Sequence, residues 1–418
     1  MMNPKNIKPA VPKYRFKGAY DKDGNWIAFT DPWEQRKLGE IYGSIGNAFV
    51  GTATPYYAEQ GHFYLESNNV KDGQINHNSE VFINDEFYEK QKDKWLHTGD
   101  MVMVQSGHVG HAAVIPEELD NTAAHALIMF RNPKEEIEPY FLNYEYQTDK
   151  AKKKIENITT GNTIKHILAS DMQEFVVDVP KYEEQKVIAG YFRNIDHLIT
   201  LHQRKYEEMK TLKRYMLQKM FPQSEQKVPE IRFAGFTEDW EQRKFADFTW
   251  DAGKRNKEDL DLEPYAITNE HGFIRQCDAH DDFGYMKDTD RKAYNIVQPN
   301  SFAYNPARIN VGSIGYYKGV ENVIVSSLYE VFQTDNYVND RFLWHWLKSD
   351  EFPRWIERLQ EGSVRLYFYY DKLCECQLYM PSLEEQEKIA SFLDALDHLI
   401  TLHQRKYLKV KLHRKQQL

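Results

Sequence analysis

Eleven consecutive residues, DHLITLHQRKY, occur twice in this chain, at Asp196–Tyr206 and at Asp397–Tyr407. The copies lie 201 residues apart, since 397 − 196 = 201, which is close to half of the 418 residues. A second repeated sequence, WEQRK, precedes each copy, at Trp33–Lys37 and at Trp240–Lys244. A repeat of this size fixes the architecture before any element is assigned. The chain therefore contains one sequence unit twice, in which the opening and the final stretch are retained and the residues between them differ.

The residues around each copy have the apolar spacing of a long packed helix. Apolar side chains recur in alternating steps of three and four, the heptad pattern of helices that pack side by side. Pro180 and Pro381 precede the two helices and Pro222 follows the first, which predicts a first helix over residues 182–220. We expect the packing surface to comprise Ile188, Phe192, Ile195, Ile199, Ile389, Leu393, Leu396 and Ile400.

The two helices are expected to pack on each other, antiparallel, in a pseudo-twofold internal repeat. Ser382 and Glu385 have the spacing of a capping box, whereas Lys181 stands where the first helix needs its cap. His202 and His403 fall at equivalent positions of the packing surface, where a structural role is favoured over a functional one. A second apolar edge, available to another protein, comprises Leu198, Leu201, Leu399 and Leu402.

The residues between WEQRK and the helix have the pattern of an α+β lobe in each repeat. Helical stretches are predicted over Pro139–Ile155 and Asp340–Leu359. The fold class is therefore α+β, with two similar globular lobes separated by two long helices. We assign the lobes to residues 1–180 and 222–380, and the helices to 181–221 and 381–418. Apolar runs bounded by Gly, Asn and Asp predict strands at Met101–Val104, Ala124–Phe130, Val320–Val325 and Leu328–Phe332.

The composition excludes several classes of protein. The net charge is −9, so no overall basic field points to nucleic acid, although a local basic groove remains compatible with it. Three cysteines make no disulfide framework and favour a reducing compartment. Cys374 and Cys376 are expected to alternate across a strand rather than to bind metal, because no second Cys or His pair has ligand spacing. Without a leader-like or membrane-length apolar run, we expect a cytoplasmic protein with no membrane contact.

Polar residues in matched loops of the two lobes are candidates for contact with DNA bases. Arg pairs with the acceptors of a guanine edge and Asn with the edge of adenine. The predicted loop within Tyr304–Ser313 supplies four such candidates: Asn305, Arg308, Asn310 and Ser313. Its counterpart Gln105–His111 supplies Gln105, Ser106 and His108. A plain turn or surface role is the alternative for each of these residues.

A second pair of matched turns, each beginning at a glycine, suits contact with phosphates. Small hydroxyl and amide side chains with one basic residue near a glycine turn are typical of such contacts. The candidates are Asn162, Thr163 and Lys165 after Gly161, and Ser363 and Arg365 after Gly362. Lys152, from the run Lys152–Lys154, is a further candidate, although such a run is also typical of a solvated helix face.

The chain lacks the common motifs of catalysis. It contains no Walker A sequence, no GxGxxG after a strand and no zinc signature. Asn305–Arg308 is superficially similar to the NPP-aromatic motif of amino-methyltransferases, but it lacks the second proline and the aromatic residue. We therefore assign no catalytic and no metal-binding residue.

The duplicated plan resembles the specificity subunit of type I restriction-modification enzymes. Its specific part is the pattern P-x-x-EEQ-x-x-I-A, which opens both helices at Pro180 and at Pro381. The lobe openings Val11–Phe16 and Val228–Phe233, each followed by WEQRK, are similar to those of the family. The resemblance covers essentially the whole chain, although the lobes themselves vary within the family.

The resemblance implies that each lobe is a target recognition domain for one half of a divided sequence in double-stranded DNA. The helices would set the spacer and dock the modification subunits, two of them, which use S-adenosylmethionine to methylate adenine. Restriction subunits would add ATP- and Mg-dependent translocation and cleavage. The chain itself would be non-catalytic and would hold no cofactor.

Two departures from a perfect repeat accompany this resemblance. The first lobe has a longer opening, Lys17–Asp31, and the counterpart of Met220 would fall at position 421, since 220 + 201 = 421. The main alternative is a stand-alone, two-lobed DNA-binding regulator without enzyme partners. A lobe with a degenerate nuclease or methylase site and a pure coiled-coil scaffold are further alternatives, and a scaffold does not explain why the lobes diverge at polar loop positions.

Overall fold

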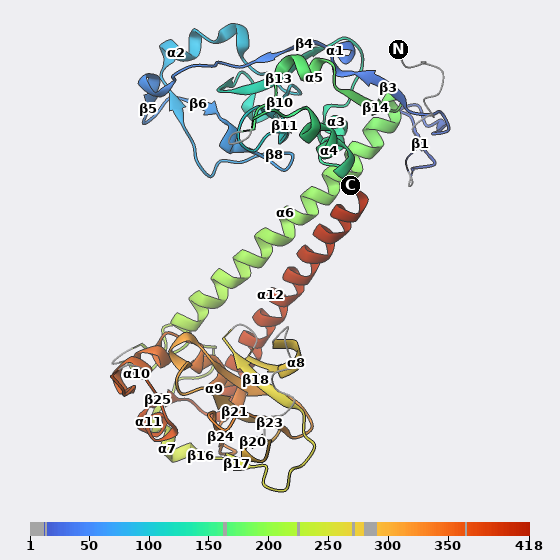
Figure 1. Ribbon diagram of the computed structural model, residues 1–418. Helices are drawn as coiled ribbons and strands as arrows, with labels where there is room; N and C mark the ends of the chain where they lie inside the picture. The colour runs from blue at the N-terminus through green and yellow to red at the C-terminus, as the bar shows by residue number, and fades with distance from the viewer. Residues whose placement is uncertain are drawn as a thin grey trace. The chain divides into compact units, whose positions relative to one another are not determined.

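The computed structural model describes residues 12, 15–161, 165–223, 226–269, 272–279, 291–363 and 366–418 (Figure 1). The chain divides into two compact units, of which unit 1 comprises Met1–Leu201 with Tyr407–Leu418 and unit 2 comprises His202–Lys406. Each unit holds one lobe and a part of both long helices. The four-segment division expected from the sequence stays a prediction.

Lobe 1, in unit 1, is built on a four-stranded antiparallel sheet. Its strand order is β11 (Ala112–Val114), β10 (Met101–Val104), β13 (Leu127–Pro133) and β4 (Tyr42–Asn47). Every residue of β10 is buried, because both faces of the sheet are covered. Met101 and Met103 pack into one apolar cluster and Val102 and Val104 into another, as the two-residue period of a strand requires.

Shorter elements complete lobe 1. A second sheet has the order β12 (Ala123–Ala124), β6 (His62–Leu65), β9 (Phe82–Ile83) and β5 (Tyr57–Ala58). The two-stranded pairs are β1 (Gly18–Tyr20) with β2 (Trp26–Ala28), β7 (Val70–Lys71) with β8 (Gln74–Ile75), and β3 (Glu34–Lys37) with β14 (Val176–Val179). The helices are α1 (Leu38–Ile41), α2 (Asp85–Glu89), α3 (Pro139–Glu145), α4 (Asp149–Ile158) and α5 (Ala169–Gln173).

Lobe 2, in unit 2, repeats this plan. Its four-stranded antiparallel sheet has the order β22 (Ile314–Tyr317), β21 (Ser301–Tyr304), β24 (Glu330–Thr334) and β16 (Thr249–Asp251). In each lobe, the central buried strand therefore pairs with the next strand of a hairpin on one side and with a later strand on the other. The prediction of two similar α+β lobes is confirmed.

The remaining elements of lobe 2 surround this sheet. A five-stranded sheet has the order β17 (Lys254–Arg255), β20 (Asn295–Val297), β23 (Val323–Val325), β18 (Pro264–Thr268) and β19 (Gly272–Arg275). β15 (Glu241–Lys244) pairs with β25 (Gln377–Met380). The helices are α7 (Phe245–Phe248), α8 (Gln276–Ala279), α9 (Asp340–Leu347), α10 (Glu351–Leu359) and α11 (Tyr370–Glu375).

The long helices are α6 (Tyr182–Lys219) and α12 (Leu383–Gln417), so the predicted span of the first is correct to one residue. In unit 1, Phe192 and Ile195 are buried and cluster with Ile188, Ile199 and, from α12, Val410. In unit 2, Ile389, Leu393 and Leu396 belong to the main core, against Met209 and Leu212 of α6. Ile400 is half-buried. Within unit 2 the two helices run antiparallel, because His202 meets His403 while Lys213 meets Asp397.

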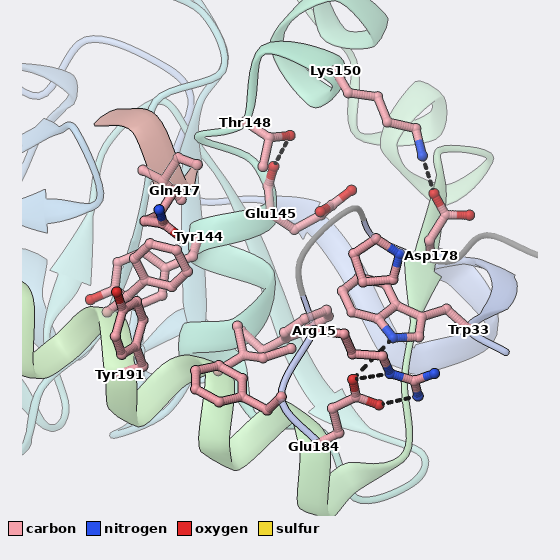
Figure 2. A pocket seen from close by; sticks show the side chains of 16 residues that line it. Arg15, Trp33, Tyr144, Glu145, Thr148, Lys150, Asp178, Glu184, Tyr191 and Gln417 are labelled. Atoms are coloured by element: carbon pink, nitrogen blue, oxygen red, sulfur yellow. Dashed lines mark hydrogen bonds and ion pairs between the residues drawn. The ribbon is translucent and has the colours of Figure 1, made fainter. Parts of the chain in front are cut away.

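The repeated EEQ sequence ties each helix start to its own lobe. Glu184, 1% exposed, accepts two hydrogen bonds from Arg15 at 2.7 and 2.6 Å, drawn as dashed lines in Figure 2. Glu385, also 1% exposed, accepts two from Arg232 at 2.7 and 2.8 Å. The glutamine that follows each Glu accepts from a backbone N–H at the start of α3 or α9, in Gln185–Glu138 (2.9 Å) and Gln386–Asn339 (2.8 Å). These matched bonds explain why the second Glu and the Gln of this sequence recur at the start of both helices.

Only half of the predicted capping box of α12 forms. The Ser382 hydroxyl accepts from the Glu385 N–H at 3.4 Å. The Glu385 carboxylate is held by Arg232 instead of returning to the cap, because a paired, charge-assisted hydrogen bond is stronger than a bond to a neutral backbone N–H.

Three further predictions about local structure are corrected. The stretch Pro139–Ile155 is two helices, α3 and α4, because the Thr148 hydroxyl accepts from the Ala151 N–H at 3.1 Å and starts a new helix. The stretch Asp340–Leu359 is likewise divided into α9 and α10. Cys374 lies in helix α11 and Cys376 caps it, rather than both lying in a strand. Leu373 and Cys376 are the buried positions, and their spacing of three suits a helix.

Candidate nucleic-acid interface

The two candidate segments of lobe 1 lie together. The Gly107 N–H donates to the Lys165 carbonyl at 3.1 Å, and the Ile167 N–H donates to the Gln105 carbonyl at 3.0 Å. Ser106 and His166 form an isolated bridge between the same segments. Gly110, with φ 89°, is required here, because an added Cβ would lie 2.9 Å from a methyl group of Ile155. The base-contact loop and the phosphate-contact turn of lobe 1 therefore form one surface.

Lobe 2 has the same backbone arrangement. The Phe368 N–H donates to the Pro306 carbonyl at 3.1 Å, which matches Ile167 and Gln105 at the repeat offset, since 167 + 201 = 368 and 105 + 201 = 306. Glu361 and Tyr367 exchange two backbone hydrogen bonds of 2.8 Å. The corresponding residues of lobe 1, Thr160 and His166, exchange two of 2.9 and 2.8 Å. We call the residues joined by these shared bonds the loop frame: Gln105 with Ile167 and Thr160 with His166 in lobe 1, and Pro306 with Phe368 and Glu361 with Tyr367 in lobe 2.

In lobe 1, the side chains on the loop frame surround a hollow of about 340 Å³. His108, Lys152 and Lys165 line it, all three of them exposed. His108 Nε2 lies 3.0 Å from the Ser67 carbonyl, and Lys165 lies 3.3 Å from Glu156. Burial lowers the pKa of the neighbouring His111, so its imidazole is neutral at pH 7. Gln105 and Ser106 are half-buried beside this hollow.

In lobe 2, the loop frame presents a different set. Arg308 and Asn310 are exposed, and their side chains make no hydrogen bond or ion pair with the described part of the chain. Asn305 Oδ1 accepts from the Ala307 N–H at 3.0 Å and so shapes the turn. Ser313 is buried, and its hydroxyl donates to the Ile267 carbonyl at 2.8 Å, which leaves it engaged inside the lobe. The side chains available to a ligand are therefore Arg308 and Asn310.

Of the four remaining candidates, the structure describes one, Ser363. Ser363 is exposed beside the loop frame of lobe 2. Asn162, Thr163 and Arg365 lie outside the described residues.

Lys348 of α9 is a residue that sequence reasoning missed. Its ammonium lies 3.4 Å from the Gly312 carbonyl, at the end of the Arg308 loop. Burial lowers its pKa to about 8, with a further contribution from Lys213. At pH 7 the group therefore remains mostly charged beneath the loop. The helix that supplies it comes from a distant part of the chain, so no local signal links Lys348 to Arg308.

A pair of matched ion pairs between the long helices was also missed. Lys213 binds Asp397 at 2.5 Å in unit 2, and Arg414 binds Asp196 in unit 1. Both partners repeat at the offset of 201, since 213 + 201 = 414 and 196 + 201 = 397. The available signal was the first residue of the repeated DHLITLHQRKY sequence, an Asp in both copies.

Among the described residues, one group has the donor set of a metal site: His345, Asp394 and Asp397. Its carboxylates already bind cations, since Asp394 accepts from Arg341 and Asp397 from Lys213. His345 Nε2 lies 2.9 Å from Asp394. The group is therefore a closed ionic network in unit 2. No helix in the described ranges is both long and apolar enough to cross a membrane.

The model of a protein family, the "Type I restriction modification DNA specificity domain", matches residues 30–211 and 237–412, which is more than half of the chain. The MjaVIII specificity subunit of Methanocaldococcus jannaschii is 23% identical over 272 residues, 58% of this chain and 60% of that subunit's length. The putative MjaX specificity subunit of the same organism is 23% identical over 389 residues, 89% of this chain and 88% of that protein.

A solved structure has the same fold. It is the S subunit of a type I restriction-modification system from M. genitalium, with a TM-score of 0.59 at 14% identity, covering 92% of this chain and 94% of that one. The two matched segments contain the two lobes, each with most of its long helix, as the internal repeat requires. The chain therefore belongs to the type I restriction-modification DNA specificity family, with two copies of the family's domain.

Proposed function

We propose that this chain is the non-catalytic specificity subunit of a type I restriction-modification complex, and that each lobe binds one half of a divided target in double-stranded DNA. The observation that carries the proposal is the loop frame. It has the same backbone hydrogen bonds in both lobes but presents different polar side chains. A shared backbone arrangement with different polar side chains suits two domains that each recognise a different DNA sequence.

The proposed contacts differ in kind between the lobes. Arg308 and Asn310 have unengaged side chains of the types that read guanine and adenine edges in the major groove. His108, Lys152 and Lys165 in lobe 1, with Ser363 in lobe 2, are proposed to contact bases or phosphates around the same loops, together with Gln105, Ser106, Asn162, Thr163 and Arg365. Asn305 shapes its loop, and Ser313 is left out because its hydroxyl is engaged inside the lobe.

The long helices are proposed to dock the modification subunits, two in number. Three residues of their second apolar edge are exposed, Leu198 at 42%, Leu201 at 39% and Leu399 at 38%, and the fourth, Leu402, is half-buried. Such side chains on an otherwise packed helix are a docking surface for another protein. The modification subunits would bring S-adenosylmethionine and the methyl-transfer chemistry, and restriction subunits would bring the ATP- and Mg-dependent steps.

The test is methylome sequencing of a host without other DNA methylases, supplied with this chain and its cognate modification subunit. We expect adenine methylation at a two-part motif with a fixed gap. If the complex assembles and no site is methylated, the stand-alone DNA-binding regulator replaces the proposal.

Docking is tested separately with Leu198→Asp and Leu399→Asp in one chain. This variant should lose the modification subunit in co-purification and retain DNA binding. The control is Asn194→Asp, which adds a charge at another exposed position of α6 and should retain both. Normal co-purification of the double variant would contradict docking through this edge.

A further inference from the structure

Two histidines of lobe 1 share the loop Gln105–His111. The rings of His108 and His111 lie 5.4 Å apart, centroid to centroid, and both line the hollow of about 340 Å³. His108 is exposed and His111 is half-buried. Each ring has one nitrogen in contact with the segment 67–75, which contains β7 and β8. The other nitrogen of each ring makes no hydrogen bond with the described part of the chain and is available to a ligand.

The contact of His111 fixes which of its nitrogens carries the hydrogen. The Asp72 N–H donates to His111 Nδ1 at 3.1 Å, so Nδ1 presents a lone pair. Burial lowers the pKa of His111 below its usual value, in spite of the nearby Asp72 carboxylate, and the ring is neutral. A neutral imidazole carries one hydrogen, which must then be on Nε2. His111 therefore offers a donor to a ligand.

The contact of His108 has the opposite sense. Its Nε2 lies 3.0 Å from the Ser67 carbonyl oxygen. A carbonyl can only accept, so Nε2 carries the hydrogen, and Nδ1 of the neutral ring is left with a lone pair. His108 therefore offers an acceptor where His111 offers a donor, although the two residues are of the same type.

The segment that orients both rings is itself anchored in lobe 1. It turns at Asp72 and Gly73, whose φ angles of 51° and 85° are the left-handed values that an Asp-Gly hairpin turn requires. Asn143 of α3 donates to the Gly73 carbonyl at 2.8 Å, and Gly73 forms a bridge with Ala113 of β11. Because these contacts hold the turn from outside the loop, the two tautomers are set before any ligand arrives.

Lobe 2 has a different arrangement at the same positions. In this loop the repeat offset is 202, so His108 corresponds to Asn310 and His111 to Ser313, since 108 + 202 = 310 and 111 + 202 = 313. Ser313 is buried and its hydroxyl is engaged inside the lobe. The pair of oriented rings is therefore a feature by which lobe 1 differs from lobe 2.

A neighbouring donor and acceptor match one kind of DNA group. In the major groove, adenine presents an acceptor, N7, beside a donor, its N6 amino group, whereas guanine presents two acceptors. Guanine would place its O6 against the lone pair of His108. A phosphate oxygen likewise has no hydrogen to donate to His108 Nδ1, so a base edge suits the pair better than the DNA backbone does.

We propose that His108 and His111 together recognise one adenine in the half-site of lobe 1, a proposal that rests on the proposed function for its ligand, double-stranded DNA. The His111 N–H donates to N7, and His108 Nδ1 accepts from the N6 amino group. His111 is thereby added to the residues that determine specificity, and the two histidines act as a unit.

Substitutions at His108 test this assignment. Once the methylome has given the target of the unaltered chain, binding is titrated on duplexes changed at one position at a time. Discrimination between adenine and guanine at one position should fall roughly ten- to a hundredfold in His108→Ala. His108→Lys replaces the acceptor by a donor and should shift the preference to guanine. The matched control is His97→Ala, at another exposed histidine of lobe 1, which should leave all preferences unchanged.

A base analogue tests His111. A duplex with 7-deazaadenine at this position lacks the N7 acceptor and should bind the unaltered chain about tenfold more weakly. His111→Ala should bind the modified and the normal duplex equally, because it lacks the donor. Unchanged preferences at the half-site of lobe 2 show that this variant is folded. If it does not fold, the His108 variants, at an exposed position, keep the test decisive.

Three results would overturn the proposal. Equal weakening on all sequences would make the two histidines phosphate contacts. A change confined to a G·C position would mean recognition of another base edge. Lower stability with unchanged preferences would mean that the rings serve only the structure of lobe 1. Each of these results leaves a methylated two-part motif in place, whereas failure of the proposed function leaves no motif and removes both proposals.

Discussion

Lobe 1 and lobe 2 share a backbone and differ in what they place on it. The backbone hydrogen bond between residues 105 and 167 recurs between 306 and 368, and the buried Glu184–Arg15 pair recurs as Glu385–Arg232. The exposed polar residues on these loops nevertheless differ: His108 and Lys165 in lobe 1, and Arg308 and Asn310 in lobe 2. The difference teaches that bonds at the helix starts and loop bases define the fold, and that the loop tips are free to diverge.

The largest expected difference between the units concerns the residues at the ends of the two long helices, because Phe221, just after α6, is 1% exposed and Leu418, just after α12, is half-buried. Phe221→Ala should destabilise unit 2 by about 3–5 kcal/mol, because it empties a fully buried position. Leu418→Ala, at a half-buried position of unit 1, should cost well below about 1 kcal/mol, in the range of surface substitutions. Hydrogen exchange by mass spectrometry, read separately for each unit, measures both. Equal losses of protection would remove the contrast between the fully buried Phe221 and the half-buried Leu418.

Next in size is the loss of a buried ion pair that both units contain. Arg232→Ala leaves the Glu385 carboxylate buried without its partner, and Arg15→Ala does the same to Glu184. We expect a cost of about 3 kcal/mol for each, at the lower end for such pairs because neither arginine is fully buried. Trp33 Nε1 also approaches Glu184, at 3.4 Å, so Arg15→Ala should be the milder of the two. Denaturant unfolding measures both variants, and equal losses would show that this indole contributes nothing.

The divergence of the loops is tested by a smaller effect on DNA binding. Arg308→Ala should cost about 1–3 kcal/mol of discrimination at one half-site and leave the other half-site unchanged. Lys165→Ala should weaken binding to all sequences more evenly, with a smaller dependence on salt. Binding titrations on targets altered in one half at a time distinguish the two outcomes. A uniform loss with Arg308→Ala would make this residue a phosphate contact.

The smallest expected effect is the contribution of His202, in unit 2, to the pH dependence of stability. Burial lowers the pKa of His202 below the usual 6.5, and His403 and Lys406 lower it further. The unfolded chain then binds a proton more readily than the folded one, so stability is full above pH 6.5 and falls as the pH drops through 6.5 toward the folded pKa. Melting temperatures between about pH 5 and 8 should show this loss, and His202→Gln should reduce it. An unchanged slope in that variant would place the titrating group elsewhere.

Much of the fold could be predicted because the repeat is long and periodic. The bounds of α6 follow from Pro180, Pro222 and a heptad pattern, which are local signals. The division of Pro139–Ile155 into two helices depends on one hydroxyl, that of Thr148. The spacing of apolar residues gives no indication of this helix start. Glu385 could be read as a cap from its spacing, but its carboxylate is held by Arg232, 153 residues away. Long-range charge pairing overrides local capping in that case.

The candidate interface was accessible to sequence reasoning only in part. The matched loops could be found by their offset, but the bonds that join residues 105–107 to 165–167 depend on the folded chain. Ser313 has the residue type of a DNA contact, and only burial shows that its hydroxyl is engaged with Ile267.

The contact between His202 and His403 places a residue against its own repeat counterpart. Their Nδ1 atoms lie 3.2 Å apart, so both rings offer the same atom to each other. One proton must lie between two nitrogens, and only one ring can supply it while the other presents a lone pair. While both rings are neutral, these two histidines in identical eleven-residue sequences must therefore adopt different tautomers. The duplication is repeated in sequence and in backbone, but at this contact the two halves differ by the position of a single hydrogen atom.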